Sequence, residues 1–318
     1  MPAINLVVSC TNRKRYPTAP GLALRDISDH DIAGRLRIWK ERLQRVPADR
    51  YPADELYIGD HWAVARGIPR LLAERGVTIR LWICSAGYGL VRSDSLLKSY
   101  QAAFTPGSED YVATDAKDRS AAIRSWWLGV CSLRLNGEEA APRTLAQLAA
   151  TQPRTPILVA LSVDYLDAVA DDLQEALRRP FFEEHLSIVS CGTTGQRHAW
   201  AHNLLPCDGL MSGSLGGTLT SLNVRVARHL LSSSNSSVPT VERLATLARS
   251  IPRTAMASPE RQPRSDKQVL AFIRRALRRS PAPSRSRLLR EFRDAGLACE
   301  QGRFSNLYRA AMAMEAAS

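Results

Sequence analysis

The sequence predicts an α/β protein with a central, mostly parallel sheet covered by helices, followed by a small all-α C-terminal domain of helix-turn-helix type. Four apolar runs, at residues 4–8, 79–84, 157–161 and 186–191, contain no alternation of apolar and polar residues. Such runs are typical of strands buried on both faces. Helical patterns lie between them, and this alternation indicates a doubly wound sheet. A basic helical pattern after residue 265 predicts the C-terminal domain.

The helices are expected from apolar spacing and from their end signals. Residues 32–46 are amphipathic, and residues 62–75 stop before a glycine, which favours a helix end. Residues 116–128 and 166–178 also have helical periodicity. Residues 212–231 begin with small residues and continue as a helix. The sequence thus predicts a catalytic domain at 1–231, a linker with one short helix at 232–264, and a helical domain at 265–318.

The C-terminal residues predict two helices joined by a turn at Gly296. Arg303, Asn306 and Arg309 would lie on an open face of the last helix, where helix-turn-helix proteins contact DNA. A helical bundle that merely docks on the main domain is the alternative.

Composition and charge favour a nucleic-acid partner. The formal net charge is +12, the sequence pI is about 9.9, and arginine dominates the basic residues. Such an excess favours a polyanion, and we expect DNA, double-stranded and modified. General arginine-rich codon usage is the alternative explanation.

The location and the cofactors follow from what the sequence lacks. No run of 18 apolar residues and no signal-peptide pattern occurs, so we expect a cytoplasmic protein without membrane contact. The six cysteines are scattered without a CxxC pair, so no metal is expected. Cys10, Cys84 and Cys191 are expected as buried thiols. Neither GxGxxG nor a P-loop occurs, so no nucleotide cofactor is expected.

Candidate site residues follow the predicted strands, because ligands of such sheets bind beyond the carboxyl ends of the strands. In "LVVSCTNRK", Ser9 begins a polar loop, Arg13 and Lys14 would grip phosphate, and Asn12 would orient a water or contact a base edge. An ordinary polar loop is the alternative.

The segment "CSAGYGLVRSDSLLKSYQAAFTPGSEDYV" adds flat and acidic groups. Ser85 precedes Tyr88, whose flanking Gly87 and Gly89 would let the backbone approach a ligand. Tyr88, Tyr100 and Phe104 would stack on a base, Arg92 would hold a phosphate, and Asp110 would activate water. In the alternative interpretation the aromatic residues are core and Asp110 caps a helix.

Three further segments contribute candidates. Ser162 and Asp164 follow the third strand, and Arg197 lies in the polar loop after the fourth. In "ADELYIGDHW", Asp60 is either a helix N-cap or a functional acid, and His61 is beside it.

The ordered motifs "VVSCTNRKR", "ADELYIGDHW", "ICSAGYGLV", "YQAAFTPGSEDYV" and "SLGGTLTSLN" resemble those of YaaA-like and DUF6884-type prokaryotic proteins, over about residues 4–230. The resemblance implies a uracil-DNA-glycosylase-like fold. Some similar proteins belong to phage-defence loci, and one kind excises glucosylated hydroxymethylcytosine. It also implies a pocket of Ser9, Asn12, Lys14, Ser85, Gly87, Tyr88 and Gly89, with Asp110 as the acid. The chain lacks the acid-Pro-Tyr run and an HPSPLS-like segment, so uracil itself is not the expected base.

Together these features predict a DNA N-glycosylase that flips out and excises a modified base, with Asp110 and Asn12 as catalytic residues. An enzyme that alters a modified or deazapurine base in place and a non-catalytic DNA-binding regulator are the alternatives. The oligomeric state is left open.

Overall fold

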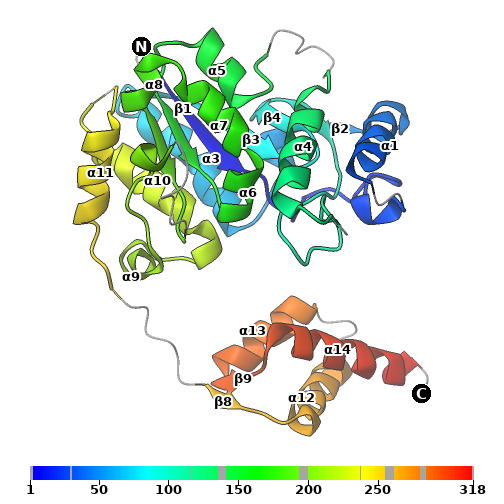
Figure 1. The fold of residues 1–318 in the computed structure, drawn as a ribbon. Coiled ribbons are helices and arrows are strands. Elements are labelled where there is room, and N and C mark those ends of the chain that lie inside the picture. The colour runs from blue at the N-terminus through cyan, green and yellow to red at the C-terminus, as the bar shows by residue number, and fades with distance from the viewer. Residues whose placement is uncertain are drawn as a thin grey trace. The chain divides into compact units, whose positions relative to one another are not determined.

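The computed structural model describes residues 3–28, 31–114, 116–134, 141–192, 200–236, 238–254, 261–279 and 284–316. The chain divides into two compact units, Met1–Ala255 and Met256–Ser318 (Figure 1). Each has its own apolar core, so each is described separately below.

The main unit is built on a five-stranded sheet, as the four apolar runs predicted. The strands are β1 (Ala3–Ser9), β3 (Thr78–Ser85), β4 (Gly89–Arg92), β6 (Ile157–Ala160) and β7 (Leu186–Val189). Their order is β4-β3-β1-β6-β7, and only β4 is antiparallel to its neighbour. All residues of β6 and β7 are buried, because helices cover both faces of a sheet of this kind.

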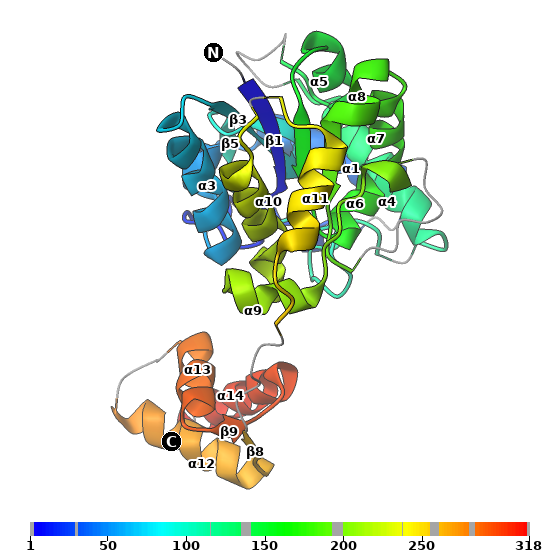
Figure 2. The same ribbon diagram turned by 90° about the vertical axis from the view of Figure 1, so that its left-hand side faces the viewer.

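Helices pack on both faces of the sheet. One face carries α3 (Asp60–Ala73), α10 (Leu222–Ser233) and α11 (Val241–Ser250) (Figure 2). The other carries α4 (Arg119–Cys131), α6 (Val163–Ala168) and α7 (Ala170–Leu177), with α1 (Ile32–Arg45) against α4. The expected helix at 166–178 is in fact the pair α6 and α7, which meet at Val169.

Shorter elements complete the main unit. They are α2 (Ala53–Leu56), α5 (Leu145–Thr151), α8 (Pro180–His185), α9 (Ser212–Leu215), and the antiparallel pair β2 (Arg50–Pro52) and β5 (Leu96–Lys98). Side-chain caps start several helices: the carboxylate of Asp31 accepts from the backbone of α1, and Asp118, Thr144 and Thr240 do the same for α4, α5 and α11.

The expected linker at 232–264 is wrong for most of its length. Helix α11 packs on α10, α8 and β7, and it buries Val241, Leu244 and Ala248 in the main core. Residues up to 254 therefore belong to the main unit. The "SSSNSSVP" segment is a polar connection between two packed helices.

Cys191 was expected to be a buried thiol, and this prediction is wrong. Cys191, at the end of β7, forms a disulfide with Cys207, and their Cα atoms are 4.8 Å apart. Cys10 and Cys84 are buried thiols, as predicted.

The second unit contains α12 (Asp266–Arg279), α13 (Arg285–Asp294) and α14 (Gln301–Ala316). They enclose a core that includes Val269, Ile273, Leu288, Phe292 and Phe304. A turn with Gly296 at φ +74° follows α13, where the sequence placed it. The unit is not all-α, because β8 (Gln262–Pro263) pairs in parallel with β9 (Leu297–Ala298). In the described part of the chain, no helix is both long and apolar enough to cross a bilayer.

Candidate functional site

Polar side chains gather where β1, β3 and β6 end. These strands are neighbours, and they end at Ser9, Ser85 and Ala160. Helices α3 and α6 begin at the same edge because each connects parallel strands. We call one group of side chains there the rim cluster, consisting of Cys10, Lys14, Tyr57, Ser85, Tyr100 and Tyr165.

A chain of hydroxyl groups runs through the rim cluster. The Ser85 hydroxyl is 2.6 Å from the Tyr100 hydroxyl, which is 3.0 Å from the Tyr57 hydroxyl. Burial raises the pKa of Tyr57 and of Tyr100 well above the ordinary value. Both phenols are therefore neutral at physiological pH, and both side chains are buried within this hydrogen-bonded chain.

Lys14 lies on these aromatic rings. A backbone bridge pairs it with Tyr57, and its Nζ is 4.3 Å from the Tyr100 ring centroid. Nζ donates to the Asn12 carbonyl at 3.5 Å. Among the described residues, no carboxylate lies within ion-pair distance of Nζ. Burial lowers the pKa of Lys14 to about 8, and Cys10 and Asp110 offset only part of that effect. The environment of Lys14 thus differs from that of a lysine that extends into solvent to bind a phosphate.

Asp164 is perturbed in the opposite direction. It lies in the first turn of α6 and is half-buried. Burial raises the pKa of Asp164, a hydrogen bond from Thr105 opposes the shift, and the like charge of Asp167 adds to it. The adjacent Tyr165 hydroxyl is 3.1 Å from the Cys10 Sγ, which connects α6 to the loop after β1. Lys14 and Asp164 follow the neighbouring strands β1 and β6, and an acid with a raised pKa at the same sheet edge as a lysine with a lowered pKa is typical of functional sites.

The motifs "GDHW" and "SLGGTLTSLN" meet beside the rim cluster. Asp60 at the start of α3 pairs with Arg225 of α10 at 2.7 Å, and Thr218 donates to the same carboxylate at 3.4 Å. The glycine at 217 is required here, because a Cβ would lie 2.1 Å from the Arg225 Nε.

His61 contacts the end of β1. Its Nε2 is 3.4 Å from the Ser9 hydroxyl and 3.2 Å from the Ser9 carbonyl. Burial lowers the pKa of His61, and the hydrogen bond to Ser9 opposes that shift. The imidazole is therefore neutral at pH 7 and orients the first residue of the loop.

The aromatic residues expected to stack on a base are core residues instead. Tyr88 is 4% exposed, and Tyr100 and Phe104 are fully buried. Tyr100 packs edge-on against Tyr88, and Phe104 edge-on against Tyr165. None presents an open face: Tyr88 and Phe104 form the wall behind the rim cluster, and Tyr100 is a fully buried member of it.

The two glycines beside Tyr88 admit protein neighbours where the sequence predicted a ligand. A Cβ at position 87 would lie 2.4 Å from a Tyr100 ring carbon, and one at position 89 would lie 2.8 Å from Cys131. Gly89 also has φ +77°, which favours glycine. Both positions therefore serve packing.

The expected role of Asp110 in activating water does not fit its surroundings. Asp110 is 5% exposed, its Oδ1 accepts from the Arg25 backbone at 3.1 Å, and its Oδ2 is 2.9 Å from the Arg25 guanidinium. Both oxygens are thus engaged. Asp110 is not a helix cap either. Its charge raises the pKa of Lys14.

Arg92 is not at the rim. It pairs across the sheet with Trp82, whereas the rim end of that hairpin is Ser85 opposite Gly89. Its guanidinium pairs with Asp94. Arg92 is therefore a poor candidate for a phosphate contact near the site.

The first loop remains open. Asn12 and Arg13 are exposed, and the Thr11 hydroxyl fixes the loop by donating to the carbonyls of Arg13 and Ile58. Ser162 is the residue before α6, and its hydroxyl does not cap that helix. Arg197 lies outside the described residues.

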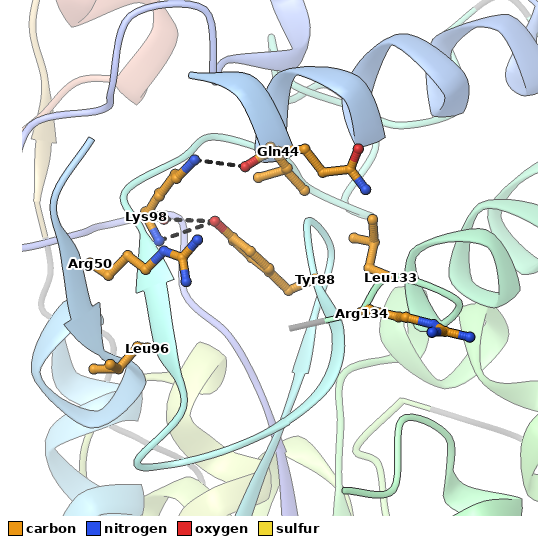
Figure 3. Close-up of a pocket in the computed structure, with 8 residues that line it drawn as sticks. Gln44, Arg50, Tyr88, Leu96, Lys98, Leu133 and Arg134 are labelled. Carbon is orange, nitrogen blue, oxygen red and sulfur yellow. Dashed lines mark hydrogen bonds between the residues drawn. The ribbon is translucent and has the colours of Figure 1, made fainter. Parts of the chain in front are cut away.

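A basic pocket lies next to the core ring of Tyr88. Its volume is about 140 Å³, and Leu43, Gln44, Arg50, Tyr88, Leu96, Lys98, Leu133 and Arg134 line it (Figure 3). The Tyr88 hydroxyl bonds the Lys98 backbone, and the Lys98 ammonium donates to the Leu43 carbonyl at 2.8 Å. Arg50 and Arg134 are exposed, so this pocket offers positive charge that the sequence did not single out.

In the second unit, the three residues expected to contact DNA have different surroundings. Arg303 pairs with Asp266 of α12 at 2.6 Å and donates to the Arg264 carbonyl at 2.9 Å. Asn306 and Arg309 are exposed on α14, and Arg309 donates to the Asn306 side chain at 2.8 Å. The open face exists, but Arg303 stabilises the fold of the unit.

Tyr57, His61 and Arg225 were not among the site residues predicted from the sequence. Tyr57 and His61 stand in a noted polar stretch before a helix, which was their only signal. The sequence around Arg225 contained no such signal, because its partner Asp60 is 165 residues away.

Within the described residues, no group of three His, Cys, Asp or Glu side chains is placed to hold a metal ion. No family model, curated protein or solved structure matches this chain.

Proposed function

We propose that this protein is a DNA N-glycosylase that flips a modified base out of DNA, excises it and leaves an abasic site. The observation that carries the proposal is the position of Lys14 and Asp164 after the neighbouring parallel strands β1 and β6, at one carboxyl edge of the sheet, where burial lowers the pKa of the lysine and raises that of the acid. Glycosidic bond cleavage needs a carboxylate close to the sugar and hydrogen-bond donors close to the departing base. Asp164 would supply the carboxylate, and Lys14 and Ser162 the donors.

We assign the water-activating role to Asp164 instead of Asp110. An acid with a raised pKa is a stronger base than an ordinary carboxylate, and Asp164 is half-buried at the first turn of a helix. Asn12, exposed on the neighbouring loop, would position the water. The Lys14 amine and the Ser162 hydroxyl, both half-buried, would hydrogen-bond the everted base, and the buried hydroxyl chain of Ser85, Tyr100 and Tyr57 would keep that edge preorganised.

The second unit supports DNA as the partner. Residues 256–318 contain 13 Lys and Arg against six Asp and Glu, so they carry +7 of the net charge of +12. Backbone phosphates are the natural counterpart of such a charge, and binding of this kind weakens as salt rises. Arg13, Arg50 and Arg134 would add contacts from the main unit.

The substrate base is proposed from the resemblance to YaaA-like and DUF6884-type proteins. Under that resemblance the base is a modified one, with glucosylated hydroxymethylcytosine of phage DNA as the first to test, and the role is antiviral defence. No cofactor is needed for this chemistry.

The experiment is incubation with genomic DNAs that carry different modified bases, followed by mass spectrometry of the released small molecules. We expect one base to be released by the wild type, with alkali-labile sites left in the DNA. Asp164→Asn should abolish release and keep DNA affinity. Asp171→Asn is the control, because it makes the same change at an exposed acid. The ion pair between Asp171 and Arg124 is long, at 3.5 Å. Release from none of the DNAs would refute the function; full activity of Asp164→Asn would refute the role of Asp164.

Two other functions predict different results. An enzyme that alters the base in place would change the mass of a base retained in the DNA and leave no alkali-labile site. A DNA-binding regulator, which the charge of the second unit favours, would keep its biological effect after Asp164→Asn.

A further inference from the structure

Lysine is rare in this chain, and that makes Lys14 unusual. The sequence contains five lysines and 38 arginines. Arginine would hold a phosphate at least as well as lysine, since its guanidinium binds two oxygens at once. What lysine alone provides is an amine that loses its proton near neutral pH and then acts as a nucleophile.

All five lysines lie in the described part of the chain, and only Lys14 lies at the rim. Lys98 is buried and donates to the Leu43 and Val46 carbonyls at 2.8 and 2.6 Å. Lys40 donates to Ser132 at 2.8 Å. Lys117 is exposed before α4, and Lys267 is in the second unit. Lys14 is therefore the amine that a ligand above the sheet would meet.

The surroundings of Lys14 favour a free amine. Its Nζ is buried without a carboxylate partner among the described residues, and its only hydrogen bond to a described residue is a long one to the Asn12 carbonyl, at 3.5 Å. The phenol rings at 4.3 and 5.8 Å attract the charged form and offset part of this effect. With a pKa of about 8, roughly one Nζ in ten is neutral at pH 7, against roughly one in 3,000 for the ordinary value of 10.5.

We propose that Lys14 is an amine nucleophile that forms an imine with the C1′ aldehyde of an abasic deoxyribose. The Nζ lone pair attacks C1′ and a C–N bond forms. A proton moves from nitrogen to the former carbonyl oxygen, a second proton from solvent adds to the resulting hydroxyl, the C–O bond breaks, and water leaves. The product is a protonated Schiff base between Lys14 and the sugar. The inference rests on the proposed function, because base release is what generates this aldehyde at the site.

The test uses an oligonucleotide that already contains one abasic site, so that no knowledge of the modified base is needed. The protein is incubated with it, and sodium borohydride is added to reduce any imine to a stable amine. We expect a covalent protein–DNA adduct, and mass spectrometry of its peptides should place it on Lys14. Lys14→Arg, which keeps the charge, should lower adduct yield by at least 100-fold. Lys40→Arg, on α1 away from the rim, should leave the yield unchanged.

The pH dependence gives a second readout. The groups that face Lys14 are Cys10, Tyr57, Tyr100 and the more distant Asp110. Adduct formation should rise tenfold per pH unit below pH 7 and level off above pH 8. A rate that keeps rising to pH 10, an adduct on another amine, or no adduct from the wild type would overturn the proposal.

This design separates the inference from the function it rests on. Base release from modified DNA without any trapped adduct would refute the imine and leave the glycosylase standing. A Lys14 adduct on abasic DNA without base release from any modified DNA would support the imine and refute the glycosylase. The protein would then process abasic sites made by another enzyme.

Discussion

Replacing Gly87 by alanine should destabilise the main unit by about 3 kcal/mol. The new Cβ would lie 2.4 and 2.6 Å from two Tyr100 ring carbons and 3.1 Å from Trp39, where ordinary contacts begin at 3.4 Å. The Tyr100 ring must therefore move by about 1 Å. Overpacking of this kind costs about 1–3 kcal/mol. The shift also stretches the 2.6 Å bond to Ser85 and the 3.0 Å bond to Tyr57, at about 1 kcal/mol each.

The assay is urea denaturation of the full chain followed by tryptophan fluorescence. All six tryptophans lie in the main unit, at positions 39, 62, 82, 126, 127 and 200, so the second unit does not contribute to the signal. The matched control is Gly67→Ala, an exposed position inside α3 where a Cβ meets nothing within 4 Å. That control should stabilise the unit by about 0.5–1 kcal/mol, because alanine favours helix. If Gly87→Ala is as stable as the wild type, position 87 does not hold Tyr100 in place and the packing argument is wrong.

Three further outcomes are expected. Gly217→Ala should cost about 3 kcal/mol in the same assay, because it combines φ +80° with a clash against a guanidinium, and wild-type stability of this variant would contradict that account. Asp164→Asn should raise the stability of the main unit at pH 7, because burial disfavours the charged carboxylate. This gain should vanish as the pH falls below 3.8, where the wild-type carboxyl is also neutral; a gain that persists there would contradict the assigned cause. Arg309→Ala should weaken DNA binding and lower the slope of log affinity against log salt by about one, with an unchanged melting temperature. Arg303→Ala should instead lower the melting temperature of the second unit, and equal melting temperatures for the two variants would contradict its structural role.

The sheet could be predicted from the sequence because its signal is local. Runs such as residues 4–8 and 157–161 are apolar throughout, and burial on both faces is the one condition that demands this. Strand β4 carries no such signal, since Gly89–Arg92 is four residues long and starts with glycine. The helix α11 was predicted at the right place, but its docking was not, because Val241 and Leu244 reveal an apolar face without revealing its partner.

The location of the candidate residues was predicted more accurately than their roles. Ser9, Lys14, Ser85 and Asp164 do lie at the carboxyl edge, since strand direction alone determines that edge. The role of Asp110 depended on Arg25, which is 85 residues away and turns a candidate base into a buried ion pair. Aromatic side chains such as Phe104 look the same in a sequence whether they pack inside a core or face a ligand.

The pairing of Asp60 with Arg225 has a consequence for how the protein is made. It joins α3, which leaves the ribosome early, to α10, which is translated nearly at the end of the main unit, so this ion pair forms only after most of the unit has been made. Contacts of such high sequence separation slow folding, since the intervening loop must close before they form. The sheet edge where Asp60 lies is therefore incomplete until α10 has emerged, when synthesis of that unit is almost finished.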